Sequence, residues 1–122
     1  MKLQLTQSAG NKLITGFGAG WVEVNEARFS NSVIVLPALL VTDWDAPDFE
    51  HLSEVHFDRL ATLLPEIVLL GTGETHRFVH PRLSRALSLA GIGLECMSTG
   101  AACRTYNILM AEGRHVAAAL II

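Results

Sequence analysis

The chain ends in seven apolar residues, Val116-Ala-Ala-Ala-Leu-Ile-Ile122. A strand with one face in water would alternate apolar and polar residues, so an unbroken apolar run indicates a strand that is covered on both faces. The run is far shorter than the roughly 20 residues that a membrane-spanning helix needs. We therefore expect a strand near the centre of a sheet, with other layers of structure on both sides.

Before this run, the sequence alternates between predicted strands and predicted helices. Short apolar runs bounded by turn residues predict strands at residues 67–70 and 94–97. Apolar residues three or four positions apart, together with Ser, Pro and Gly at the ends, predict helices within residues 53–65, 81–90 and 98–113. This order is typical of an α/β fold, in which helices cover the faces of one sheet.

The first third of the chain is predicted to consist of strands. Residues 13–18 and 21–25 flank a Gly-Ala-Gly turn, which indicates a β-hairpin. Residues 32–36 form a β-branched run before a proline, and a short strand is expected at residues 38–42. The loop residues 43–47 follow. The hairpin should make the central sheet mixed or form a second small sheet.

Composition predicts one globular domain over residues 1–122, since 50% of the residues are hydrophobic and 17% are charged. The net charge of −3 argues against nucleic-acid binding, which needs a basic surface. No signal-peptide core is evident near the first residue, and no run is long enough for membrane insertion. We therefore expect a cytoplasmic protein.

The cysteines and histidines give little indication of chemistry. Cys96 and Cys103 are expected to be buried and reduced. Cys103 lies near a predicted helix N-terminus, which can lower a thiol pKa, but no base partner is evident in the sequence. His76 and His80 lack a third ligand nearby, so no metal site is predicted, and no cofactor motif is present.

One candidate binding site lies where two predicted parallel strands end. Gly71-Thr72-Gly73 follows one strand, and Thr99 and Arg104 lie in the first turns of the helix after the other. Open α/β sheets usually bind ligands at this edge, and a helix N-terminus with an arginine suits an anion. We hypothesise a crevice between residues 71–75 and 98–104. The alternative is structural, with glycines for a tight turn and Thr99 as an N-cap.

The last helix carries a second group of candidates. Arg104 and Asn107 share a polar side that Arg114 continues, and Glu112 lies beside it. An asparagine in the middle of a helix predicts a specific hydrogen bond, within the chain or to a partner. The alternative is an ordinary solvated helix face.

The motifs together resemble one family. They are Leu69-Leu-Gly-Thr-Gly73, Gly91-Ile-Gly-Leu-Glu-Cys-Met-Ser-Thr99 and, above all, Ala101-Ala-Cys-Arg-Thr-Tyr-Asn-Ile-Leu-Met-Ala-Glu-Gly-Arg114. This pattern is similar to the domain of unknown function shared by adipogenesis-associated Mth-type domain proteins and mitochondrial complex I assembly factor 3. Ser32-Val-Ile-Val-Leu-Pro37 and Trp44 fit its early part. The resemblance covers nearly the whole chain.

The resemblance implies a three-layer α/β fold with a mixed central sheet, whose last strand is central and antiparallel to its neighbours. It implies no established activity and no cofactor. Two functions remain open. The first is a non-catalytic interaction or assembly protein, linked to respiratory complex I and forming a homo-oligomer, that binds partners through the last helix. The second is a small-molecule binder or enzyme that uses the 71–75/98–104 crevice for an anion.

Overall fold

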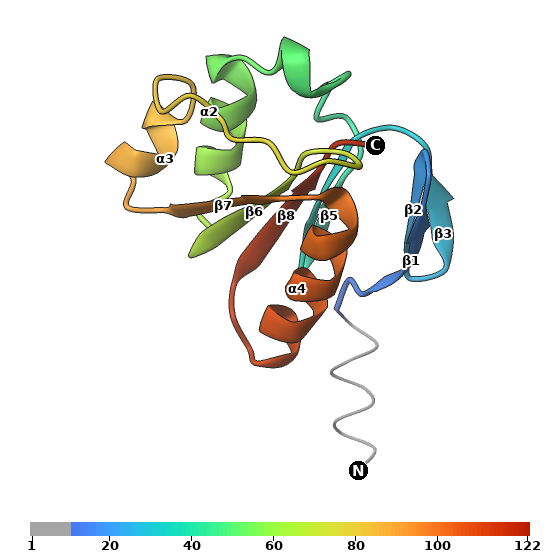
Figure 1. Cartoon of the computed structure of the whole chain (residues 1–122). Coiled ribbons are helices and arrows are strands. Elements are labelled where there is room, and N and C mark those ends of the chain that lie inside the picture. Colours follow the sequence, from blue (N-terminus) through green and yellow to red (C-terminus); the bar gives the residue numbers. More distant parts are fainter. Residues whose placement is uncertain (1–10) are drawn as a thin grey trace.

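A five-stranded mixed sheet forms the centre of the molecule (Figure 1). The computed structural model describes residues 11–122. Across the sheet, the strands follow the order β5 (Leu39–Val41), β4 (Val33–Leu36), β8 (Val116–Leu120), β6 (Ile67–Gly71) and β7 (Gly93–Met97). The C-terminal strand β8 is therefore central, and all five of its residues are buried, as the apolar run predicted.

The directions of the strands correct one expectation. β8 is antiparallel to β4 but parallel to β6, and β6 is parallel to β7. The expectation that the last strand is antiparallel to its neighbours is therefore wrong on the β6 side. The helix between β7 and β8 returns the chain across the sheet, and such a crossover connects strands that run in the same direction.

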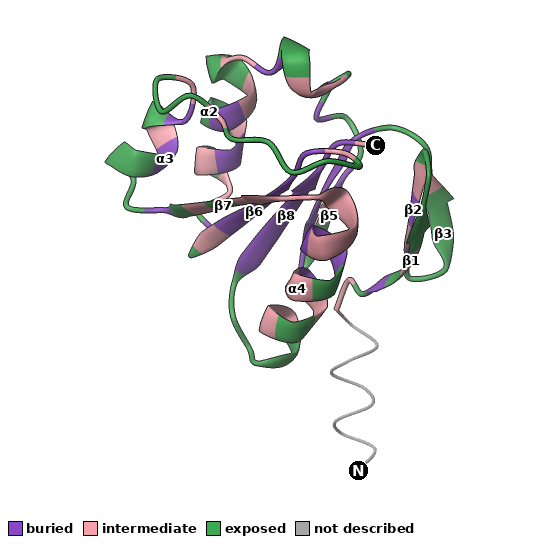
Figure 2. Cartoon of the chain, in the orientation of Figure 1, coloured by how far each residue is buried: buried purple, intermediate pink, exposed green. Residues whose placement is uncertain are grey.

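Helices cover both faces of the sheet (Figures 1 and 2). On one face, α2 (Glu54–Thr62) and α3 (Arg85–Leu89) join a core that includes Phe57, Leu60 and Leu87. On the other face, α4 (Thr99–Ala111) contributes Ala102, Cys103 and Tyr106 to a second core. β8 supplies residues to both cores, which explains why its sequence has no polar position.

A small antiparallel sheet packs beside α4, in the order β1 (Ile14–Gly18), β2 (Trp21–Val24) and β3 (Ala27–Phe29). Its first two strands are the predicted hairpin. The third strand was not predicted, and it follows a turn in which Asn25 and Glu26 have φ angles of 49° and 71°. Two left-handed residues are typical of a tight hairpin turn, although Glu26 occupies a position where glycine is usual.

The helix ends follow the sequence signals in two cases. Ser53 and His56 form a capping box at the start of α2, and the Ser98 hydroxyl accepts the Ala101 N–H at the start of α4. The helix predicted at residues 81–90 is shorter, because residues 81–84 form turns and regular α-helix begins only at Arg85. A 3-10 helix, η1 (Phe49–His51), precedes α2.

Among residues 11–122, none of the helices combines the length and the apolar character required to cross a lipid bilayer.

Candidate functional site

Three parallel strands end at one edge of the sheet, and hydrogen bonds around Thr99 connect their ends. The Thr99 hydroxyl donates to the carbonyl of Ile121 at 2.7 Å and accepts the N–H of Gly73 at 2.8 Å. The Thr99 N–H donates to the carbonyl of Gly73 at 2.8 Å. Nearby, the hydroxyl of the buried Thr72 donates to the carbonyl of Thr75 at 2.6 Å. The structure thus places the two predicted loops side by side.

Gly71 is required by this close approach. A Cβ atom at position 71 would lie 2.9 Å from the Cα of Thr99 and 3.0 Å from its hydroxyl oxygen. Gly73 has a φ of 98°, a conformation that other residues rarely adopt. Gly71, Gly73 and Thr99 therefore have structural functions in joining β6 to the start of α4, and Gly73 and Thr99 also line a cavity.

The cavity has a volume of about 690 Å³ and opens between the β1–β2 turn and the N-terminal end of α4. We call it the turn–helix cleft. Its walls are residues 17–21, residues 73–74, residues 98–100 with Arg104, and residues 121–122. The walls formed by residues 73–74 and by residues 98–100 with Arg104 belong to the predicted crevice between residues 71–75 and 98–104. The wall from the β1–β2 turn was not predicted, because the position of the hairpin against α4 cannot be deduced from local sequence.

Arg104 and Phe17 lie on facing walls of the turn–helix cleft. The Arg104 guanidinium carbon is 5.5 Å from the centre of the Phe17 ring, within the range of a cation–π interaction. Phe17 also packs on Gly100, where a Cβ atom would lie 2.8 Å from the ring. Arg104 forms no salt bridge with any residue in the described range 11–122. Its positive charge is therefore available at the cleft.

Asn107 does not line the turn–helix cleft. Its side chain instead joins the small sheet to α4. Its side-chain oxygen accepts the N–H of Ile14 at 3.0 Å, and its side-chain nitrogen donates to the carbonyl of Ile14 at 2.7 Å. The preceding residue, Tyr106, is buried, and its hydroxyl donates to the carbonyl of Lys12 at 2.7 Å. The specific hydrogen bond expected for Asn107 is therefore present, and it lies within the chain.

Glu112 and Arg114 lie at the opposite end of α4 from the cleft. Glu112 is the C-terminal cap residue of the helix and is exposed. The Arg114 side chain donates to the Glu66 carboxylate at 2.9 Å, and this bond holds the pKa of Glu66 below its usual value. Of the eight candidate residues, Gly73, Thr99 and Arg104 line the cleft, Gly71 and Thr72 support it, and Asn107, Glu112 and Arg114 lie elsewhere.

The two cysteines are free, and Cys103 is buried while Cys96 is half-buried. Burial raises the pKa of the Cys103 thiol to about 11, above its ordinary value of 9.0. The neighbouring Arg104 acts in the opposite direction but more weakly. A reactive thiol needs a lowered pKa, so the hypothesis of a catalytic Cys103 is not supported.

Histidines do not gather in the described part of the chain. No cluster of three or more His, Cys, Asp or Glu side chains that could bind a metal occurs in residues 11–122. The His76 ring packs against Phe78 with centroids 4.5 Å apart, and Nδ1 of His80 accepts the N–H of Arg82 at 3.1 Å.

Comparison with known proteins adds a family. Residues 14–121 match the family described as proteins of unknown function DUF498/DUF598. A crystal structure of a protein from Bordetella parapertussis superposes with a TM-score of 0.86, at 39% identity, over 92% of this chain and 96% of the other. A solution structure from Bordetella pertussis, described as a Mth938-like domain, has a TM-score of 0.81 at 33% identity over 93% and 87%.

Two relatives with names are similar over most of the chain. The NADH dehydrogenase (ubiquinone) 1 alpha subcomplex assembly factor 3 of Bos taurus is 36% identical over 80% of this chain and 54% of its own length. The 13 kDa major membrane protein of Francisella tularensis is 30% identical over 75% of this chain and 76% of its own length. The chain spans about half the length of the assembly factors that it matches.

Proposed function

The chain belongs to the DUF498/DUF598 family, and from the names of its relatives we propose that it is an assembly protein for a respiratory NADH dehydrogenase. In this proposal it binds a segment of a partner protein in the turn–helix cleft and has no catalytic activity of its own. The observation that carries the proposal is the cleft itself, in which Arg104 has no counter-ion among the described residues and lies beside the half-exposed ring of Phe17.

The chemistry of the cleft favours an acidic protein segment. Arg104 can bind a carboxylate through two parallel hydrogen bonds, and the first turn of α4 adds a partial positive charge at residues 98–100. Phe17 and Trp21 offer apolar surface for the neighbouring side chains of the same segment. A volume of about 690 Å³ accommodates several side chains, since drug-sized ligand sites occupy about 300–1,000 Å³.

The names of the relatives supply the proposed partner. Proteins called assembly factor 3 of NADH dehydrogenase share 36% and 37% identity with this chain in Bos taurus and Mus musculus. This chain corresponds to about half of each of those proteins, so the transfer of their assembly function is a proposal about the shared domain. We also propose that the protein acts in the cytoplasm and forms a homo-oligomer, and analytical ultracentrifugation would test the oligomeric state.

The proposal is tested by affinity purification of the tagged chain from cells that encode it, followed by quantitative mass spectrometry. We expect enrichment of NADH dehydrogenase subunits with the wild type. Arg104→Ala should reduce their recovery by roughly tenfold or more, as for other interfacial arginines that anchor a partner. Arg82→Ala is the matched control, because Arg82 is also exposed and its side chain has no partner within residues 11–122.

The proposal fails if no NADH dehydrogenase subunit is enriched, or if both arginine variants recover these subunits as well as the wild type. Equal losses with both variants would also contradict it, because they would indicate a general effect of charge and not of the cleft.

A second function, the binding of a small anionic metabolite, is favoured by one feature of the same cleft. The N-terminus of α4 and Arg104 converge on it, and this combination binds free carboxylates and phosphates as well as acidic side chains. Thermal-shift measurements with anionic metabolites separate the two functions. A saturable rise in melting temperature that Arg104→Ala abolishes and Arg82→Ala retains would favour the small ligand.

A further inference from the structure

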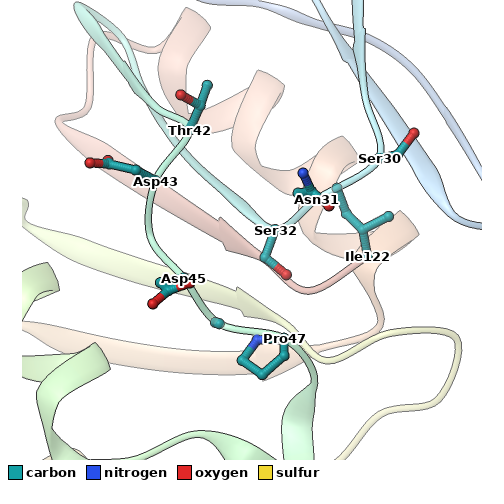
Figure 3. A pocket seen from close by; sticks show the side chains of 9 residues that line it. Ser30, Asn31, Ser32, Thr42, Asp43, Asp45, Pro47 and Ile122 are labelled. Carbon is teal, nitrogen blue, oxygen red and sulfur yellow. The ribbon is translucent and has the colours of Figure 1, made fainter.

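A second cavity, of about 520 Å³, lies between the approach to β4, the loop after β5 and the end of β8 (Figure 3). We call it the β4–β5 pocket. Its lining consists of residues 30–32, residues 42–43, residues 45–47 and Ile122. Polar side chains with oxygen atoms dominate, and the apolar contributions come from Ala46, Pro47 and Ile122. Neither the family nor the proposed assembly function assigns any role to this pocket.

Ser32 is the most informative residue of the β4–β5 pocket. It is only 7% exposed, yet its hydroxyl has no hydrogen-bond partner among residues 11–122. The other buried polar residues in this range, Thr72 and Ser84, both have such partners. Figure 3 shows the Ser32 hydroxyl directed into the space between the 45–47 segment and Ile122. No fully buried side-chain oxygen or nitrogen in the described range lacks a hydrogen-bond partner, so the Ser32 hydroxyl oxygen is still accessible from the pocket and is free to bond to a ligand atom.

Asp45 gives the pocket its charge. The Arg59 guanidinium binds the Asp43 carboxylate at 2.7 Å, whereas the Asp45 carboxylate has no partner in the described part of the chain. Figure 3 shows the Asp43 side chain directed away from the pocket. Because Arg59 offsets the charge of Asp43, Asp45 leaves the pocket with a net negative charge.

The backbone of Asp45 is fixed by its neighbours. Its φ is 67°, in the left-handed region that aspartate and asparagine tolerate better than most residues. Nε2 of His56 lies 3.0 Å from the carbonyl of Asp45, and the Trp44 indole N–H donates to the carbonyl of His56 at 3.1 Å. Trp44 is 2% exposed and anchors this loop in the core. The carboxylate is therefore presented by a well-anchored loop.

We propose that the β4–β5 pocket binds a small organic cation, a primary ammonium group on an aliphatic stem. The ammonium group would donate hydrogen bonds to the Ser32 hydroxyl and the Asp45 carboxylate, and the stem would pack on Pro47 and Ile122. The cavity is far larger than a single metal ion and falls within the size range of organic ligand sites, about 300–1,000 Å³. This site is separate from the turn–helix cleft, although Ile122 contributes to both.

The test is an NMR titration of the full ¹⁵N-labelled chain with putrescine, which carries two primary ammonium groups on a four-carbon stem. We expect saturable shifts of the backbone amides of residues 30–32 and 45–46. Butane-1,4-diol has the same stem without the charge and should give no saturable shift at the same concentrations. Potassium chloride at matched ionic strength controls for general screening.

Two variants locate the binding. Asp45→Asn preserves the size of the side chain and its tolerance for the left-handed backbone conformation, and it removes only the charge. Putrescine should therefore bind at least about fivefold more weakly to this variant. Asp58→Asn removes the same charge from the exposed face of α2 and should leave binding unchanged. Ser32→Ala should weaken binding while the melting temperature stays equal or rises, because the hydroxyl has no partner in the free protein.

The proposal is overturned if putrescine causes no saturable shift, or if butane-1,4-diol shifts the same amides equally. It is also overturned if Asp45→Asn and Asp58→Asn weaken binding to the same extent. A large fall in the melting temperature of Ser32→Ala would show that the hydroxyl already has a partner within the chain, which removes the main argument for a ligand.

Discussion

Asn107 offers a sharp test of how the small sheet is attached to the rest of the molecule. Its side-chain amide pairs with both the N–H and the carbonyl of Ile14, at 3.0 and 2.7 Å, and Ile14 is only 5% exposed. Asn107→Ala would leave two backbone polar groups of a buried residue without their partners. We therefore expect this single substitution to loosen β1 from α4.

The expected loss of stability can be estimated from these two bonds. An unsatisfied buried group costs about 1–3 kcal/mol, so the two groups at Ile14 together cost about 3 kcal/mol. Alanine is the better helix former by about 0.6 kcal/mol, which reduces the net loss to about 2.5 kcal/mol. For a domain of this size, that loss corresponds to a fall in melting temperature of about 10 °C.

Urea unfolding, monitored by circular dichroism and tryptophan fluorescence, measures this loss of stability. Amide hydrogen exchange adds a local readout, since the Ile14 amide should exchange faster in the variant. Ile108→Ala is the control, because Ile108 is the next residue on the helix and is 60% exposed. If Asn107→Ala lowered the free energy of unfolding by less than about 0.5 kcal/mol, or left the Ile14 exchange rate unchanged, the Asn107 amide would not be what joins the small sheet to α4.

Three further predictions concern the cores and the sheet edge. Gly71→Ala should lower the free energy of unfolding by about 1–3 kcal/mol in a urea titration, because its Cβ atom would lie 2.9 Å from the Cα of Thr99; an unchanged midpoint would contradict this close approach. Tyr106→Phe should lower it by about 1–2 kcal/mol, because the carbonyl of Lys12 loses the hydroxyl that donates to it at 2.7 Å; equal stability of variant and wild type would mean that water replaces the bond. The free energy of unfolding should also fall as the pH rises from 9 to about 11, since the Cys103 thiol has its pKa raised to about 11 in the folded protein and ionises first in the unfolded chain. Urea titrations across this range should give a shallower fall for Cys103→Ala, and identical slopes would exclude the contribution of this thiol.

Patterns that depend on burial predicted the fold well. The apolar run at residues 116–122 predicts a strand with both faces covered, and β8 indeed supplies alternate residues to the two cores. Strand directions were harder to predict, because the sequence of β8 is compatible with a parallel or an antiparallel neighbour on either side. In the structure, β8 has one neighbour of each kind. It is parallel to β6, because α4 returns the chain across the sheet, and it is antiparallel to β4, which comes from the N-terminal half of the chain.

The candidate site could be predicted only in part. The convergence of the 71–75 loop and the start of α4 follows from parallel strands ending at one edge. The β1–β2 turn, with Phe17 and Trp21, could not be placed, because hairpin docking depends on contacts between distant residues. One signal was present in Asn107, whose position in mid-helix predicted a hydrogen bond, but the sequence did not identify Ile14 as its partner.

The β4–β5 pocket was not predicted, because the sequence around its lining residues is typical of ordinary loops and strands. Residues 43–47 are typical of a loop, and Ser32 begins a strand-like run. Only the three-dimensional structure shows that the largely buried Ser32 has a hydroxyl without a partner among the described residues and that Ile122 lines the same cavity.

We propose above that Arg104 in the turn–helix cleft serves the assembly of a respiratory NADH dehydrogenase. The most direct measurement is the content of assembled NADH dehydrogenase in membranes from cells that lack the gene, complemented with wild type, Arg104→Ala or Arg82→Ala expressed at equal levels. We predict that deletion lowers the content of the enzyme, that the wild type and Arg82→Ala restore it, and that Arg104→Ala does not. Normal content in the deletion strain, or full restoration by Arg104→Ala, would contradict the claim.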